Sequence, residues 1–209
     1  MPIEAQATPF IIRHVTSALL KILENALTGV LAPGEIQAAP PETIPRLESG
    51  QQMLVLYLYR VEESPELKNQ GPDFETVPDP GGGAPLVRVR RDPLTLNLHY
   101  LLIPFAGEPS FLETYEILGL AMAAFHDHGI FSPGELGVTE LTEQEARLSF
   151  RLTQEPLTTD QLSNIWEAVH EPYRLSVSYC VRTVQIQSEL AITGRRVTTR
   201  RVIMRSGEA

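Results

Sequence analysis

The run "MLVLYLYRVEE" at residues 53–63 constrains the fold of this chain more than any other segment. It is made of branched and aromatic residues, which favour strands, and it stays apolar at successive positions until Arg60. A strand that is apolar on both faces belongs inside a sheet with other layers packed against it. The run therefore predicts a central strand.

Other segments supply the rest of a sheet and its helices. The sequence "PLTLNLHYLLIPF" at 93–105 alternates, with Thr95, Asn97 and His99 on its polar face, and so predicts a half-buried strand. Shorter patterns predict strands near 35–39, 145–157 and 172–187, and 3.6-residue spacing predicts helices at 7–29, 110–128 and 158–170. This order predicts an α+β fold in which three helices cover one twisted, largely antiparallel sheet of about four to six strands.

Local signals mark the helix ends. Thr8 with Pro9 can start the first helix, while Ser110 with Glu113 and Thr158 with Gln161 fit capping boxes. Glycine after the last apolar turn is typical of a helix end, as at positions 29 and 129. The second helix is expected to bury one stripe, made of Phe111, Tyr115, Leu118, Met122 and Phe125.

Two segments fall outside this periodic pattern. Residues 63–85 are rich in proline and contain Gly81–Gly83, so we expect a long irregular loop there. The last 19 residues, 191–209, hold five arginines against one acid, a net charge of +4, while the rest carries −13. We therefore expect a single domain over 1–190 and an extended C-terminal arm over 191–209, whose β propensity suits pairing with another subunit's sheet.

Composition narrows the class of protein. Hydrophobic residues make up 43% and charged residues 21%, as in soluble globular proteins, and no apolar run reaches the roughly 20 residues of a membrane span. A net charge of −9 argues against a general nucleic-acid binder. The N-terminus shows no signal-peptide pattern, and the one cysteine, Cys180, allows no disulfide framework. Folding in the cytoplasm is the simplest interpretation.

The stretch "AAFHDHGIF" at 123–131 raises the question of an active site. On a continuous helix His126 and His128 point about 200° apart and cannot share a metal ion, whereas on an extended chain they could. Histidine in the last helical turn also interacts favourably with the helix dipole and can bond free carbonyls. We interpret His126, Asp127 and His128 as a structural helix end, with a small metal-dependent enzyme as the alternative.

No other motif predicts chemistry. The glycines at 81–83 lack the Lys-Ser or Lys-Thr of a P-loop, no G-x-S-x-G occurs, and Cys180 within a strand is expected to be inert. Glu62, Glu63 and Glu66 are expected at a solvated strand edge. We predict no catalytic, cofactor-binding or metal-binding residue, and we expect Asn97 and His99 to lie in an interface together with Arg195, Arg196, Arg200 and Arg201.

Four blocks taken in order resemble a known family. They are "LYLYRVEESPELKNQ", "PLTLNLHYLLIPFA", "LGLAMAAFHDHGIF" and "EPLTTDQLSNIWEAVHEPYRLSVSYCVRTVQI". Together they resemble the tail-terminator, or tube-cap, proteins of extracellular contractile injection systems, phage-tail-like particles of the antifeeding-prophage and virulence-cassette type. The resemblance covers roughly residues 9–188.

This resemblance implies a structural role without catalysis. It implies a hexameric ring at the distal end of the inner tube, which ends tube growth and anchors the last ring of the contractile sheath. The implied partners are other copies of the chain, the tube protein and the sheath protein, with no cofactor, nucleic acid or membrane. The implied location is the cytoplasm during assembly and then the particle. A baseplate or sheath adaptor of the same particle is a further alternative.

Overall fold

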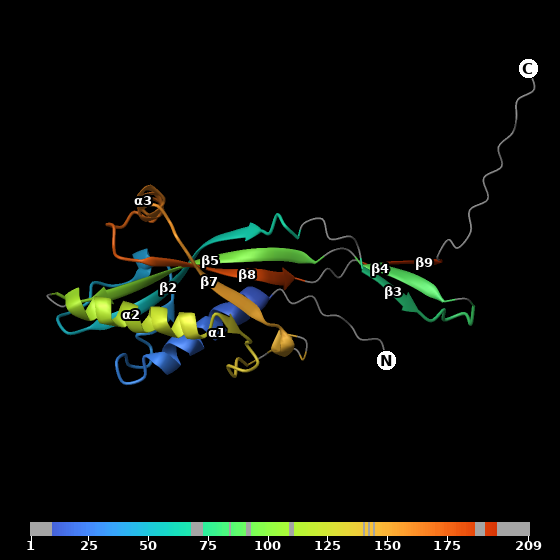
Figure 1. Cartoon of the computed structure of the whole chain (residues 1–209), viewed down its shortest axis with the longest axis horizontal. Helices are drawn as coiled ribbons and strands as arrows, with labels where there is room; N and C mark the ends of the chain where they lie inside the picture. The colour runs from blue at the N-terminus through green and yellow to red at the C-terminus, as the bar shows by residue number, and fades with distance from the viewer. Residues whose placement is uncertain are drawn as a thin grey trace, which may run out of the picture. The chain divides into compact units, whose positions relative to one another are not determined.

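The computed structural model of this chain divides into two compact units (Figure 1). The larger unit combines residues 8–68 and 94–186, and the smaller one combines residues 1–7, 69–93 and 187–209. This grouping differs from the expected division at residue 190. The structure describes residues 10–67, 73–83, 85–90, 93–108, 111–139, 141, 143, 145–186 and 191–195.

A six-stranded sheet forms the centre of the larger unit, in the order β1-β2-β5-β8-β7-β6. Its neighbouring strands are antiparallel except β1 and β2, which are parallel. The strands are β1 (Ile36–Ala38), β2 (Gln52–Glu63), β5 (Leu94–Ala106), β6 (Ile130–Phe131), β7 (Phe150–Glu155) and β8 (Val177–Ile186). The α+β class and the largely antiparallel sheet are confirmed.

Three helices pack against this sheet, and two short 3-10 turns join the strands. The helices are α1 (Ile11–Ala26), α2 (Phe111–Asp127) and α3 (Thr159–Ala168), and the turns are η1 (Pro41–Thr43) and η2 (Glu145–Arg147). The capping box of α3 is confirmed, since the Thr158 hydroxyl accepts from the Gln161 amide and the Gln161 side chain accepts from the Thr158 amide. Gly29 follows α1 with φ +87°. Thr8, Pro9 and Ser110 lie outside the described residues.

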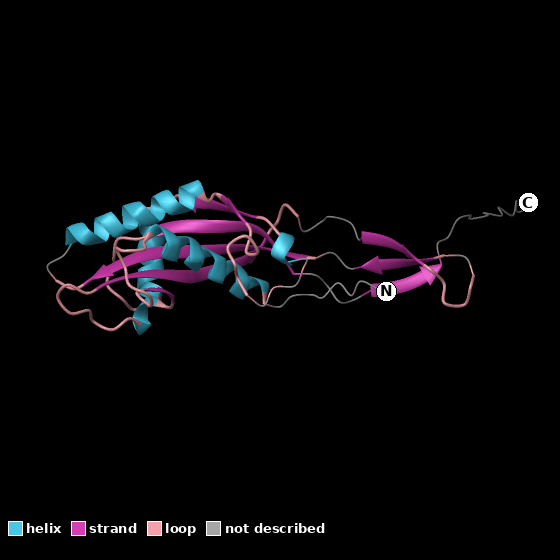
Figure 2. Cartoon of the chain, turned by 90° about the horizontal axis from the view of Figure 1, so that it is seen from below, coloured by secondary structure: helices cyan, strands magenta, loops and turns pink. Residues whose placement is uncertain are grey.

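The two faces of the sheet carry separate hydrophobic clusters. Leu98, Tyr100 and Leu102 of β5 pack with α1 and α2 on one face. Leu101 and Ile103 point to the other face and pack with Trp166 of α3. Figures 1 and 2 show α1 and α2 on the side of the sheet opposite to α3. The prediction of an apolar even-numbered face on β5 is confirmed, but the odd-numbered face is polar only along its first half, because α3 covers the second.

The smaller unit contains a second sheet, with the order β3-β4-β9. Its strands β3 (Asp73–Val77), β4 (Leu86–Arg90) and β9 (Ala191–Arg195) form two antiparallel pairs. A turn at Asp79–Gly82 joins β3 to β4, in which the Gly82 amide donates to the Asp79 carbonyl at 2.9 Å and Gly82 has φ +73°. Gly81–Gly83 therefore form a hairpin turn.

This second sheet corrects two expectations. Residues 63–85 are not one irregular loop, because β3 lies within them, and the first residues of the arginine-rich segment pair with β4 of the same chain. The alternation in "DFETV" is only five residues long and is flanked by prolines and glycines, and its sheet is completed by residues more than a hundred positions later. Within the described part of the chain, no helix is long and apolar enough to cross a membrane.

Candidate interaction surfaces

The histidines at the end of α2 complete the helix. The amide of His128 donates to the carbonyl of Ala124 at 3.1 Å, and the His128 ring nitrogen Nδ1 donates to the same carbonyl at 2.9 Å. The amide of Gly129 donates to the His126 carbonyl at 3.3 Å, while the side chains of His126 and Asp127 are exposed. The ring thus adds a second hydrogen bond to a carbonyl in the last turn of the helix, where basic side chains commonly bond the backbone.

These histidines do not converge with other ligands. No group of three or more histidine, cysteine, aspartate or glutamate side chains within the described ranges lies close enough together to hold a metal ion. His14, another histidine of the chain, is buried against Glu145, with 3.2 Å between Nδ1 and Oε1. The contact joins α1 to η2, and sequence spacing gave no sign of it because the two residues are 131 positions apart.

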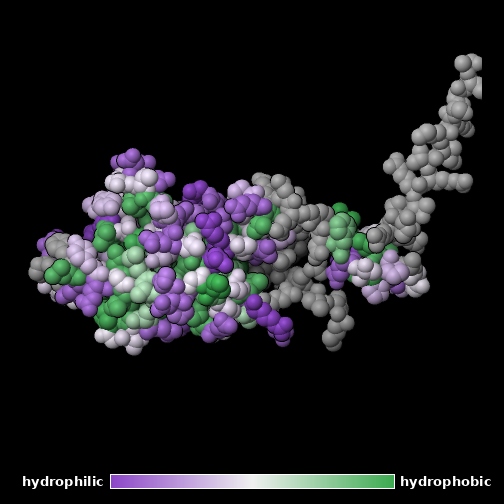
Figure 3. Space-filling view, viewed as in Figure 1, coloured by the Kyte–Doolittle hydropathy of each residue, from purple (hydrophilic) through white to green (hydrophobic). Residues whose placement is uncertain are grey.

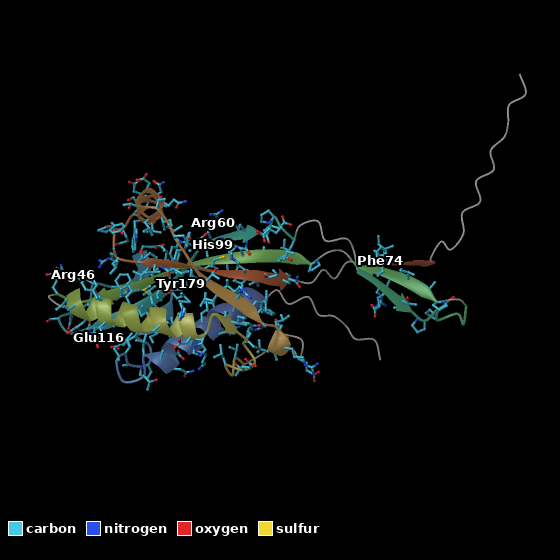
Figure 4. The ribbon with its side chains drawn as sticks, in the orientation of Figure 1. Arg46, Arg60, Phe74, His99, Glu116 and Tyr179 are labelled. Carbon is cyan, nitrogen blue, oxygen red and sulfur yellow. The ribbon has the colours of Figure 1, made fainter. Side chains whose placement is uncertain are left out.

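His99 lies at the centre of a polar cluster on the sheet. It is 3% exposed, its Nδ1 lies 2.7 Å from Glu155 Oε2, and its Nε2 lies 3.1 Å from Glu62 Oε1. Both ring nitrogens therefore face carboxylate oxygens, one from β2 and one from β7. Figure 4 shows His99 beside Arg60, which faces it across the β2–β5 pair and forms an ion pair with Glu62.

Two irregularities in strand pairing frame this cluster. The β2–β5 register shifts between Leu58 and Arg60, which leaves Tyr59 as the extra residue, and its ring packs edge-on against His99 with centroids 6.1 Å apart. The Tyr59 hydroxyl also lies 3.0 Å from the Ser178 hydroxyl. On the other side of β5 the register with β8 shifts opposite Asn97, where Thr183 has φ +66°. Such bulges re-aim side chains and are common beside functional surfaces.

We define the polar sheet face by the residues Tyr59, Glu62, Asn97, His99, Glu155 and Ser178. Asn97 and His99 were expected from the sequence, whereas Glu62 had been assigned to a solvated edge and Glu155 had not been singled out. Pairing of β2, β5, β8 and β7 brings together all of these side chains except that of Asn97, which lies two positions before His99 on β5. The cluster is a hydrogen-bonded arrangement that includes two carboxylates, which suits recognition of a polar protein surface.

Cys180 borders this face but is not a nucleophile. It is 1% exposed, and burial, the largest cause, raises the pKa of its thiol to about 11. Arg182 lowers that pKa, and Glu155 and Glu62 raise it. A reactive cysteine needs a depressed pKa and access, and this residue has neither.

The outward side of α2 exposes large apolar side chains around the exposed Glu116. Leu112 is 80% exposed, Tyr115 56% and Leu120 38%, and we call these three residues with Ala123 the α2 outer face. The expected burial of Tyr115 is therefore wrong; Ile117 and the other core residues of α2 face the sheet instead. Figure 3 shows hydrophobic residues at the surface in the region of α2, bordered by hydrophilic ones.

A groove continues this apolar surface at the start of α2. It has a volume of about 420 Å³, and its lining includes Tyr115 from α2, Pro104 from β5, and Tyr173 and Leu175 from the segment before β8. Tyr173 and Leu175 are themselves exposed. Exposed apolar groups that lie together beside aromatic residues are typical of protein contact surfaces.

The arginines expected in an interface are only partly described. Arg195 is the last residue of β9, while Arg196, Arg200 and Arg201 lie outside the described residues. Their role in an interface, and that of Asn97 and His99, stays a prediction.

Comparison with known proteins agrees with the resemblance seen in the sequence. The family described as "Pvc16 N-terminal domain" matches residues 14–200. None of the curated proteins matches the chain.

Two solved structures share the fold. One is the PVC sheath/tube terminator of an extracellular contractile injection system in its extended state, with 15% identity, a TM-score of 0.57, and coverage of 96% of this chain and 64% of that chain. The other is the tube-terminating cap of the anti-feeding prophage, with 18% identity, a TM-score of 0.59, and coverage of 91% and 60%. This chain thus spans about three fifths of the length of either protein.

Proposed function

This chain belongs to the Pvc16 N-terminal domain family, and on that premise we propose that it is a structural cap of a contractile injection system. It forms a hexameric ring at the distal end of the inner tube, ends tube growth and anchors the last ring of the sheath. It is made in the cytoplasm and becomes part of the particle. The observation that carries this proposal is the family match across nearly the whole chain, and the fold shared with two terminators supports it.

The surfaces of the larger unit suit such a role. A subunit in a closed ring needs two different surfaces that meet head to tail, and a cap needs a further surface for the structure below it. The α2 outer face is apolar and exposed, whereas the polar sheet face is charged and internally hydrogen-bonded. Because the two differ in chemistry, they suit different partners.

Catalysis has little support. The histidines at the end of α2 bond the helix backbone or face outward, His99 is held by two carboxylates, and the pKa of Cys180 is raised. A baseplate or sheath adaptor of the same particle is the nearer competitor, since it would use the same kinds of surface.

Deleting the gene and imaging the particles tests the proposal. We expect tubes or sheaths of irregular length, rescued by the full chain expressed from a plasmid. Particles of normal, uniform length and normal yield would refute a terminator. Gold labelling of a tagged chain separates cap from adaptor, because a cap is labelled only at the end opposite the baseplate.

A point variant sharpens the same test. Leu112→Asp places a charge on the α2 outer face without disturbing the core, so the subunit should melt as the wild type does but fail to rescue tube length. The control is Val30→Asp, which changes an exposed aliphatic residue after α1. Equal rescue by both variants would remove the α2 outer face from the set of contact surfaces.

A further inference from the structure

We propose that the smaller sheet joins one copy of this chain to the next. Strand β9 of one copy adds beside strand β3 of its neighbour, so that the two small sheets continue as one across the subunit boundary. This inference adds a contact between subunits to the proposed function. It rests on the proposed function for one point, that the joined copies close into a ring.

Among the residues that the structure describes, both outer strands of the small sheet have an open edge. The order is β3-β4-β9, and within the described residues β3 and β9 each pair with β4 alone. An open edge presents unpaired N–H and C=O groups to any strand that approaches. The small sheet therefore offers two places for strand addition.

Three common devices that block strand pairing are missing from both edge strands. Proteins block free edges with proline, with lysine or with a bulge. The sequences "DFETV" of β3 and "AITGR" of β9 contain no proline and no lysine, and both pairings with β4 run without a register shift. The charged residues of the two strands are acidic on β3 and basic on β9, so they favour pairing of β3 with β9 of another copy.

A single chain cannot join its own two edges. Strand β4 lies between β3 and β9, which places them about 10 Å apart at the usual strand spacing. Both are antiparallel to β4 and therefore run in the same direction. A head-to-tail rotation that brings β9 beside the next copy's β3 gives a parallel pair, and repeated rotation closes a ring.

The charges of the two edge strands are complementary in sequence. Strand β3 holds Asp73 and Glu75 and no base, while β9 ends with Arg195 and is followed by Arg196, with no acid. Acid–base pairing across strands already occurs in this sheet, where Glu75 lies 3.9 Å from Arg88. A second copy is thus the partner that supplies a basic strand to the acidic edge and an acidic strand to the basic edge.

The apolar residues of the edges support the same arrangement. Phe74, Val89 and Ile192 form one row across the three strands, and Phe74 is 66% and Ile192 78% exposed. Figure 4 labels Phe74 on β3. When β9 adds to a neighbour's β3, Ile192 lies on the same face as the neighbour's Phe74, and each covers the other.

Paired cysteines test the junction in the full chain. The variants are Glu75→Cys with Thr193→Cys, and Phe74→Cys with Ile192→Cys, each pair sharing one face of the sheet. Within one chain these positions are too far apart for a disulfide, which needs Cα atoms no more than about 7 Å apart. Oxidation of the purified chain and of whole particles should therefore give a ladder of linked copies that ends at the closed ring.

Two controls show whether the ladder comes from the junction between β9 and β3. Each single-cysteine variant should stop at a dimer, and Ala38→Cys in β1 with Gln154→Cys in β7, both in the larger sheet, should give no ladder. In parallel, Phe74→Lys should reduce the oligomer seen by light scattering to monomer, while Val30→Lys should not.

The outcomes separate this inference from the proposed function. An oligomer or a normal capped particle without any ladder overturns strand addition and leaves the cap intact. A ladder from the small-sheet pairs, together with normal particles in the deletion strain, supports strand addition and refutes the cap. A chain that stays monomeric and gives no ladder in particles overturns the inference.

Discussion

The two sheets of this chain differ in how far their apolar residues are buried. The central strand β5 is buried from Thr95 to Phe105, with hydrophobic clusters on both of its faces. The small sheet instead exposes Phe74 and Ile192 and leaves two strand edges open among the described residues. The larger unit thus contains its own stabilising contacts, whereas no described side chain of the three strands of the smaller sheet is buried.

The strongest test of this contrast is a change in the large core. Leu98 is fully buried between the sheet and the helices, so Leu98→Ala should lower the free energy of unfolding by about 3 kcal/mol through lost burial and a new cavity. Urea denaturation measures this change in the free energy of unfolding. The control Leu112→Ala, at an exposed position, should change it by less than about 0.5 kcal/mol. Equal effects at both sites would contradict the assignment of the core.

The polar sheet face should respond less strongly. His99→Leu leaves Glu62 and Glu155 without their shared partner, at a cost of about 2 kcal/mol. The cost stays below that of a broken, fully buried ion pair because the two carboxylate side chains are 33% and 25% exposed. Thermal denaturation checks this, with the exposed His126→Leu as control. A variant as stable as the wild type would show that the cluster is not a stabilising element.

The helix end should matter less again. His128→Ala removes the ring's bond to the Ala124 carbonyl and should lower stability by about 1 kcal/mol, while His126→Ala should have little effect. Calorimetry on both variants and on the double variant measures the difference. Stoichiometric, tight zinc binding that disappears in the double variant would contradict a structural role.

The smallest expected effect comes from the small sheet itself. Removing residues 191–209 deletes β9 together with all that follows, yet it should change the stability of the larger unit by less than about 0.5 kcal/mol, because β9 pairs only with β4 in the described part of the chain. Hydrogen exchange at β5 and β8 amides reports on that unit alone. Loss of protection there on truncation would show that the two units depend on each other.

Sequence reasoning succeeded where a pattern was long or locally self-contained. The apolar run of β2, the alternation of β5 and the capping box of α3 each contain their own signal within a few turns or strand positions. The helix stripe of α2 was partly wrong because that helix is apolar on most sides, so periodicity could not decide which side faces the core.

Pairing between residues far apart in the sequence accounts for the features that the sequence did not predict. His99 is 37 residues from Glu62 and 56 from Glu155, and the sheet that holds β3 is completed by β9. Nothing in the spacing of these residues indicates that they meet, because strand order and register decide it. The expected loop therefore contains β3, and the first five residues of the expected arm form β9 of the same sheet.

The buried contact between His14 and Glu145 has a consequence for synthesis of the chain. Ribosomes add roughly 5–20 residues per second, so about 7–26 s separate the two residues. Throughout that interval the apolar side of α1, with Ile11, Val15 and Leu19, lacks the later strands and the turn that it packs against in the finished fold. The larger unit therefore cannot complete its fold before β8 has been synthesised, and a chain shorter than this presents no complete larger unit for assembly.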